Sequence, residues 1–466
     1  MKNDLKAVQL PEKGSVMYAA IISLVAAVGG FLFGYDMNII AGAAPFLREE
    51  FALEGSSLGF AVASESIGCI IGALCACWLA DIIGRRRSLM IAAILLGISA
   101  IGTAFPGTIT EFNIYRIVGG LGVGLAAAVS PMYIAELAPA KIRGFLVTLN
   151  QLAIVIGCLI ANVVSYILVR NLPEETCWRW MFGSECVPVL LLIAGLFFIP
   201  RSPRWLMEKG HHEEALLVLS KVDGEENARR EIKEIQEVVS QETGSFSELF
   251  GPSIRKVFFI STVIFLFTQW GGITPLVFYA PIIFQKGGFV NADAAIMQTA
   301  IMNSFNLVCT ITALLLVDRL GRRKLCLFST LGMAFSLIIM GAVFHTGLTG
   351  IYVLLAFFLC IGTYVVGLAP LSWLLGAELF PTRIRAKGIS LASLIGVWAG
   401  GFTVTWAFAP MAEFSEKHFG SISGMLWFFA FMCFIAFVFS LKFVPETKKK
   451  TLEEIALFWM KKKKNM

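Results

Sequence analysis

The sequence predicts an all-α integral membrane protein in which 12 membrane-spanning helices form two bundles of six. Its composition, its apolar runs and an internal repeat all point to this fold class. Of 466 residues, 57% are hydrophobic and 15% are charged, whereas soluble domains carry about 25% charged residues. This composition excludes a soluble enzyme and a disordered chain, and 10 cysteines are too few for a disulfide scaffold. The Lys and Arg residues lie in short, scattered clusters, so nucleic-acid binding is not expected.

Each apolar run is long enough to cross a bilayer, which takes about 20 mostly apolar residues in a helix. Charged residues, Pro and Gly bound the runs. The spans expected in the first half are 18–42, 57–80, 88–106, 112–137, 144–170 and 179–199. Those expected in the second half are 256–285, 292–317, 324–345, 349–377, 387–410 and 420–443.

A polar stretch over 200–255 separates the two halves. The segments Glu213–Leu219 and Glu231–Glu237 combine charged and apolar residues in a way that predicts short amphipathic helices. The expected organisation follows from this stretch. It comprises an N-terminal bundle at 1–199, cytoplasmic linker helices at 200–255, a C-terminal bundle at 256–443 and a basic cytoplasmic tail at 444–466.

The distribution of basic residues predicts the orientation. Loops on the side of the two termini carry about three times as many Lys and Arg residues as the opposite loops, even without the linker and the tail. Both termini are therefore expected in the cytoplasm. The other loops are short and offer no usable Asn-x-Ser/Thr glycosylation acceptor, which favours a bacterial inner membrane.

Two charged segments occur twice. Asp81–Arg87 recurs 237 residues later as Asp318–Lys324, and Glu136–Arg143 recurs 242 residues later as Glu378–Arg385. The second six spans therefore repeat the first six. Parallel repeats around a site at mid-depth are typical of transporters, whereas a channel would more naturally be assembled from several identical subunits.

The repeated segments place carboxylates beside arginines at the cytoplasmic ends of helices. Opposite charges there can hold the two bundles together in one conformation and separate in the other. Alternatively, the arginines only fix the orientation of the helices. The residues of this expected interdomain latch are Asp81, Arg85, Glu136, Arg143, Asp318, Arg322, Glu378 and Arg385.

Asp36 and Arg116 lie well inside spans 1 and 4, where a lone ion costs about 2.5–3.5 kcal/mol. If Arg116 approaches Asp36 in only one conformation, the proton affinity of Asp36 alternates during a transport cycle. The alternative is a static ion pair. Glu65, in the outer half of span 2, has three alternatives: a solvated residue of an outer vestibule, a second proton or cation site, or a partner of a polar neighbour.

Several motifs together resemble the sugar porter family of the major facilitator superfamily over nearly the whole chain. They are Gly34–Asp36, Arg116–Gly124, Pro203–Leu206, Tyr279–Pro281 and Pro445–Lys448, with the repeated Asp-Gly-Arg loops. The first helix is most similar to proton-coupled bacterial members. The resemblance implies the major facilitator fold and a proton-coupling role for Asp36 and Arg116.

The resemblance also implies a substrate site between the bundles at mid-depth. Its expected residues are Gln151, Gln269, Asn306 and Trp373, with Thr268 and Thr274 where the family has Gln and Asn. Alternatively, these polar side chains join helices. Gly401 replaces an Asn of the family, so the C-terminal part of the pocket is expected to be less polar and roomier, suited to a bulkier or less hydroxylated sugar.

The sequence therefore predicts a secondary transporter that imports a sugar or sugar-like solute with a proton by alternating access. A proton-independent facilitator and a symporter for a cyclitol, polyol or sugar acid are the alternatives, and a sugar sensor would need a longer signalling tail. An enzyme is not expected, because no nucleophile–base pair is present and the glycine run Gly120–Gly124 reads as helix packing. We expect no cofactor or metal, partnership with solute, proton and bilayer only, and function as a monomer.

Overall fold

The computed structural model describes residues 14–139, 142–241, 246–251, 254–381 and 384–446. All 12 predicted spans are present as helices that are long and apolar enough to cross a membrane. The first half contains α1 (Val16–Glu50), α2 (Gly55–Ile83), α3 (Arg85–Ala104), α4 (Ile109–Leu137), α5 (Arg143–Asn171), and a sixth span made of α6 (Glu174–Ser184) and α7 (Cys186–Phe198).

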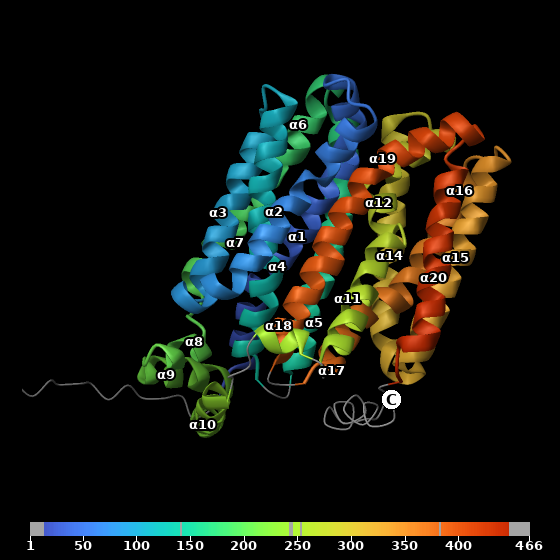
Figure 1. The fold of residues 1–466 in the computed structure, drawn as a ribbon. Coiled ribbons are helices and arrows are strands. Elements are labelled where there is room, and N and C mark those ends of the chain that lie inside the picture. Colours follow the sequence, from blue (N-terminus) through green and yellow to red (C-terminus); the bar gives the residue numbers. More distant parts are fainter. Residues whose placement is uncertain (1–13, 140–141, 242–245, 252–253, 382–383, 447–466) are drawn as a thin grey trace, which may run out of the picture.

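The polar stretch between the halves forms the expected helices. They are α8 (Pro203–Glu208), α9 (His212–Asp223), α10 (Glu225–Gln241) and the 3-10 helix η1 (Phe246–Phe250). Figure 1 shows α8–α10 at one end of the molecule, beneath the blue and teal helices of the first half. We call this end the linker face and the other end the opposite face.

The second half contains three interrupted spans. The uninterrupted helices are α14 (Ala292–Leu320), α15 (Arg322–His345) and α20 (Ser423–Phe443). Span 7 consists of α11 (Arg255–Trp270), α12 (Ile273–Phe278) and α13 (Ala280–Lys286). Span 10 is α16 (Ile351–Thr363), the π-helix η2 (Tyr364–Leu368) and α17 (Ala369–Leu379), and span 11 is α18 (Arg385–Ser393), the π-helix η4 (Leu394–Ala399) and α19 (Gly400–Phe419).

Glycines allow close approach of helices in the first half. A Cβ at Gly68 of α2 would lie 2.0 Å from the carbonyl oxygen of Ile117 in α4. A Cβ at Gly120 of α4 would lie 2.0 Å from the carbonyl oxygen of Glu65 in α2. Side chains at these positions would force the backbones apart, so the glycine run of span 4 packs helices, as predicted.

The two halves meet along α2 and α19 and along α5 and α14. At the opposite face the halves are also joined by polar contacts. The backbone N–H of Gly55 donates to the carboxylate of Glu413, and the indole Nε1 of Trp406 donates to Ser56 Oγ at 3.0 Å. Helix α1 packs against α12 and α13 as well. This structure is therefore closed between the halves at the opposite face.

Candidate functional site

A buried ion cluster lies within the first half. The Arg116 guanidinium on α4 donates through Nη1 to the carboxylate of Asp36 on α1 and through Nη2 to the carboxylate of Glu65 on α2. The exposed fraction is 0% for Asp36, 2% for Glu65 and 1% for Arg116. The Phe182 ring lies 5.7 Å from the guanidinium carbon. The structure thus brings Asp36 and Arg116 together and adds Glu65 to them.

The position of Glu65 corrects one sequence-based alternative. A solvated place in an outer vestibule does not fit a side chain that is 2% exposed and bound to Arg116. The contact depends on how closely α2 approaches α4. Because Gly120 has no side chain, the backbone of α4 lies against the carbonyl of Glu65. The same packing aims the Glu65 carboxylate at Arg116.

Glu185 is a fourth ionisable member of the cluster and was not among the site residues predicted from the sequence. It lies at the junction of α6 and α7, is 1% exposed, and its Oε1 has no hydrogen-bond partner in the structure. It interacts electrostatically with Asp36, Arg116 and Glu65. A usable signal was present in the sequence, because a single carboxylate inside the apolar run 179–199 carries the cost of a charge within a span.

The break in span 7 creates a second polar cluster. Helix α11 ends at Trp270, and Gly272 takes a backbone φ of 84° before α12 begins. This turn brings the Thr274 hydroxyl to Gln269, to whose Oε1 it donates at 2.6 Å. Gln269 Nε2 in turn donates to Thr268 Oγ1 at 3.4 Å. Interrupted helices of this kind commonly form the binding sites of secondary transporters.

Gly401 of α19 lies directly beside this polar cluster. A Cβ at Gly401 would lie 3.3 Å from Oε1 of Gln269. A longer side chain at this position would reach the amide of Gln269. Glycine therefore leaves free the space next to Gln269 that a polar side chain would otherwise occupy.

The remaining predicted binding residues lie on three other helices. Trp373 of α17 is 48% exposed, and its ring packs edge-on against Phe265 of α11 with centroids 5.0 Å apart. Asn306 of α14 is half-buried, and its Oδ1 accepts from Thr310 Oγ1 at 3.4 Å. No contact joins either residue to Gln269 among the described interactions.

Gln151 is exposed on α5, and its direction on the helix follows from helical geometry. At about 100° per residue, Gln151 lies about 120° round the helix from the exposed Phe145 and about 180° from the exposed Ile160. A polar amide is costly in contact with lipid, so the apolar pair marks the lipid side. Gln151 therefore lies on the side of α5 away from this pair.

The contacts seen for the predicted latch residues lie within their own half or, for Arg143, with a linker helix. Arg85 contacts Glu136 at 2.9 Å and Asp81 at 3.4 Å, and Arg322 contacts Glu378 at 3.2 Å. Arg143 bonds to Glu231 of α10 at 2.6 Å, and Arg385 Nε donates to the carbonyl of Phe380 at 3.4 Å. The side chain of Asp318 lies outside the described residues. The interdomain latch therefore stays a prediction.

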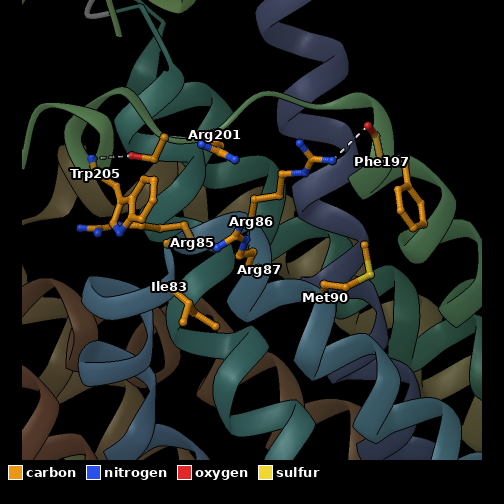
Figure 2. A pocket seen from close by; sticks show the side chains of 10 residues that line it. Ile83, Arg85, Arg86, Arg87, Met90, Phe197, Arg201 and Trp205 are labelled. Carbon is orange, nitrogen blue, oxygen red and sulfur yellow. Dashed lines mark hydrogen bonds between the residues drawn. The ribbon is translucent and has the colours of Figure 1, made fainter. Parts of the chain in front are cut away.

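A cavity of about 270 Å³ opens at the linker face of the first half, away from the interface between the halves. Figure 2 shows its arginines, Arg85–Arg87 and Arg201, with Trp205. Arg86 donates to the backbone carbonyls of Leu196 at 2.6 Å and Phe197 at 3.1 Å, and so caps the end of α7. These contacts give Arg86 a structural role at the helix end.

Twelve spans in two halves, interrupted helices in the second half and a buried ion cluster in the first define a membrane transporter and not an enzyme. A family model described as "Sugar (and other) transporter" matches residues 22–459. The chain therefore belongs to the sugar transporter family of the major facilitator superfamily.

The relatives cover nearly the whole chain. A D-xylose-proton symporter of Escherichia coli strain K12 is 39% identical, covering 95% of this chain and 96% of its own. An arabinose-proton symporter of Bacillus subtilis strain 168 is 34% identical, covering 96% of each chain. The structure of the E. coli xylose transporter XylE in an inward-open conformation has a TM-score of 0.83 at 37% identity, and covers 94% of this chain and 99% of that one.

Proposed function

We propose that this protein imports a sugar or sugar-like solute together with a proton by alternating access. The observation that carries the proposal is the Asp36–Arg116 pair, buried within two membrane spans of a sugar transporter fold. A carboxylate paired with a guanidinium is held as the anion, whereas a carboxylate that is separated from the guanidinium but still shielded from water favours its protonated form. Movement of α1 relative to α4 therefore couples proton binding to conformation. Relatives that are named proton symporters support this mechanism.

We propose that the solute binds at the break of span 7. Gln269 and Thr274 supply an amide and a hydroxyl for sugar hydroxyls, and the exposed face of Trp373 can cover the C–H surface of a ring. Gln151 and Asn306 complete the site from α5 and α14. Of the relatives described above, one is named a D-xylose-proton symporter and another an arabinose-proton symporter. The space beside Gly401 favours a bulkier or less hydroxylated sugar for this chain.

We propose that the linker face is cytoplasmic and that the membrane is a bacterial inner membrane. The basic residues of the linker-side loops and the bacterial relatives support this orientation and location. Contacts between the halves at the opposite face then make this an inward-facing state. Both polar clusters lie within one chain, so we propose that the monomer is the transporting unit.

We propose further that the linker-face ion pairs rearrange during the cycle. In this inward-facing state Arg85 and Glu136 bind within the first half, and Arg322 and Glu378 bind within the second. When the linker-face ends of the halves come together, these carboxylates and arginines are placed to pair across the interface. Neutralising Glu136 or Glu378 is then expected to shift the balance between inward- and outward-facing states, measured by spin-label distances.

The test is solute uptake into proteoliposomes with the internal and external pH recorded. Wild-type protein is expected to alkalinise the outer medium when it takes up its solute from a panel of pentoses, hexoses, disaccharides, polyols and sugar acids. One proton entering across about 100 mV supplies about 2.3 kcal/mol, enough for about 50-fold accumulation.

Replacing Asp36 by Asn is expected to abolish accumulation and to leave counterflow intact, because the amide binds no transported proton. Asp293→Asn, at the start of α14, is the matched control and should accumulate solute as the wild type does. Solute uptake without proton movement in the wild type would identify a facilitator, and pH-driven accumulation by Asp36→Asn would contradict the role of Asp36.

A further inference from the structure

We propose that Glu65 adds a second transported proton, so that the buried cluster carries two protons with each solute. The inference rests on the proposed function and goes beyond it in the number of protons moved. A single carboxylate on Arg116 would need no more than one proton per cycle. The structure gives Arg116 two carboxylates in direct contact, from α1 and α2.

The ionisable groups around Glu65 come from four elements. Arg116 faces it from α4, Asp36 from α1 and Glu185 from the junction of α6 and α7. Cys69, one turn further along α2, completes the set of titratable neighbours among the described residues. Asp36, Glu65, Glu185 and Arg116 are each exposed by 2% or less. Bulk water therefore does not compensate their charges in this conformation.

The charge of the cluster sets the number of protons it holds. Three ionised carboxylates and one guanidinium would leave two uncompensated negative charges in a buried site within the membrane. Buried charges need close partners, because the cost of removing an ion from water is several kcal/mol. The sealed cluster is neutral when two protons are bound. Without Glu65, the two remaining carboxylates and the guanidinium form a neutral cluster when one proton is bound.

These protons belong to the cluster as a whole, because strongly interacting groups titrate together. One oxygen of each carboxyl group is unpartnered in the structure, namely Asp36 Oδ2, Glu65 Oε1 and Glu185 Oε1, as is Nε of Arg116. A carboxyl oxygen in this condition can carry a proton without disturbing the bonds to Arg116. When the cluster opens to water, the carboxylates ionise and both protons leave. Glu65 thereby changes the stoichiometry of coupling and not only the strength of the Arg116 pair.

The number of protons can be read from the solute gradient at which net flux vanishes. Proteoliposomes with the membrane potential clamped at zero are given a pH difference of about one unit and a series of opposing gradients of D-xylose, or of the panel solute that the wild type transports. Flux stops at a ratio of about tenfold for one proton per solute and about hundredfold for two. The zero-flux ratio does not depend on the rate, so a slow variant still reports it.

We expect about hundredfold for the wild type and about tenfold for both Glu65→Gln and Glu65→Met. Glu175→Gln, an exposed carboxylate of α6, is the matched control and should give the wild-type ratio. A wild-type ratio near tenfold overturns the proposal even if neither Glu65 variant folds, and so does a ratio near hundredfold in a Glu65 variant. If transport is not coupled to protons and the proposed function is wrong, net flux in the wild type stops when the solute concentrations on the two sides are equal.

Discussion

At the scale of single residues, the polar cluster in span 7 is built for hydrogen bonding but is open on one side. Gln269 is held by Thr274 and Thr268, which fix the direction of its amide. On the side of α19, Gly401 contributes no side chain. A solute hydroxyl that points toward α19 would therefore find no partner at this position. We therefore expect the residue at position 401 to influence the solute preference of the protein.

Replacing Gly401 by Asn tests that dependence. The new amide should lie beside Gln269 and add one hydrogen bond to a fully hydroxylated sugar, worth about 0.5–1.5 kcal/mol. We expect the affinity for D-xylose to rise about two- to tenfold, measured by calorimetry or quenching of Trp fluorescence in detergent. Gly401→Ala fills the same space without a polar group and should bring no gain. Equal affinities in the two variants would remove Gly401 from the solute site.

The cost of charge in a membrane explains how much of the ion cluster could be predicted. Asp36 and Arg116 were recognisable because an ion inside an apolar span needs a function or a partner. The same signal marks Glu65 and Glu185. The meeting of Asp36 and Glu65 at the Arg116 guanidinium could not be predicted, because it depends on the rotation of α2 about its axis. That rotation is set by Gly68 and Gly120, where the two backbones touch.

At the scale of elements, the internal repeat is reproduced in three dimensions. Gly84 and Gly321 both have a φ of 89° at corresponding turns. The arginine that follows each glycine binds a carboxylate of its own half. The next arginine, Arg86 in one half and Arg323 in the other, donates to the carbonyl oxygens that end a later helix. In each half, the repeated segment therefore joins three helix ends through one ion pair and through hydrogen bonds to backbone carbonyls.

The backbone conformation of Gly84 makes this turn sensitive to the addition of a single methyl group. Its φ of 89° and ψ of 154° are strained for any residue with a Cβ, at a cost of about 1–3 kcal/mol. A Cβ there would also lie 3.1 Å from the Trp205 ring. We expect Gly84→Ala to lower the free energy of unfolding by about that amount, measured by denaturation in detergent.

Gly144 in α5 provides the control for this substitution. A Cβ at Gly144 would meet no atom within 4 Å, and alanine favours a helix over glycine by about 1 kcal/mol. Gly144→Ala should therefore leave stability unchanged or raise it slightly. Equal losses in the two variants would show that the backbone conformation of Gly84 is not the cause.

Helix boundaries show where sequence patterns stop being informative. The first span continues to Glu50 through Pro45, and span 11 continues to Phe419 through Pro410, although the apolar runs end earlier. Hydrophobicity marks the part of a helix that lies in lipid and not the part that extends beyond it. The π-helices η2 and η4 carry no hydrophobic signal either. They arise where packing between spans inserts an extra residue per turn.

At the scale of the whole molecule, the closed face holds the two halves through a small set of polar contacts. Glu413 of α19 accepts from the backbone N–H of Gly55 at the start of α2. Trp406, two turns earlier on α19, donates to Ser56. Elsewhere between the halves, residues of α1, α5, α6 and α13 and residues 290–293 line a groove of about 490 Å³. Opening of this face must break these polar contacts and also separate apolar packing such as Phe60 of α2 against Phe402 of α19, whose ring centroids lie 6.5 Å apart.

Replacing Glu413 by Ala should favour that separation. Loss of a hydrogen bond to a charged group costs the closed face about 1.5–3 kcal/mol, so the population open at this face should rise about ten- to hundredfold. Spin labels at positions 170 and 291, which line the groove from the two halves, would report a longer distance. Glu416, on the same helix, instead binds Lys286 within the second half, so Glu416→Ala removes an equal charge without touching the interface. Because Glu413, unlike Glu416, binds the other half, a shift in Glu413→Ala alone assigns it a role in closure. Equal shifts in both variants would attribute the effect to surface charge.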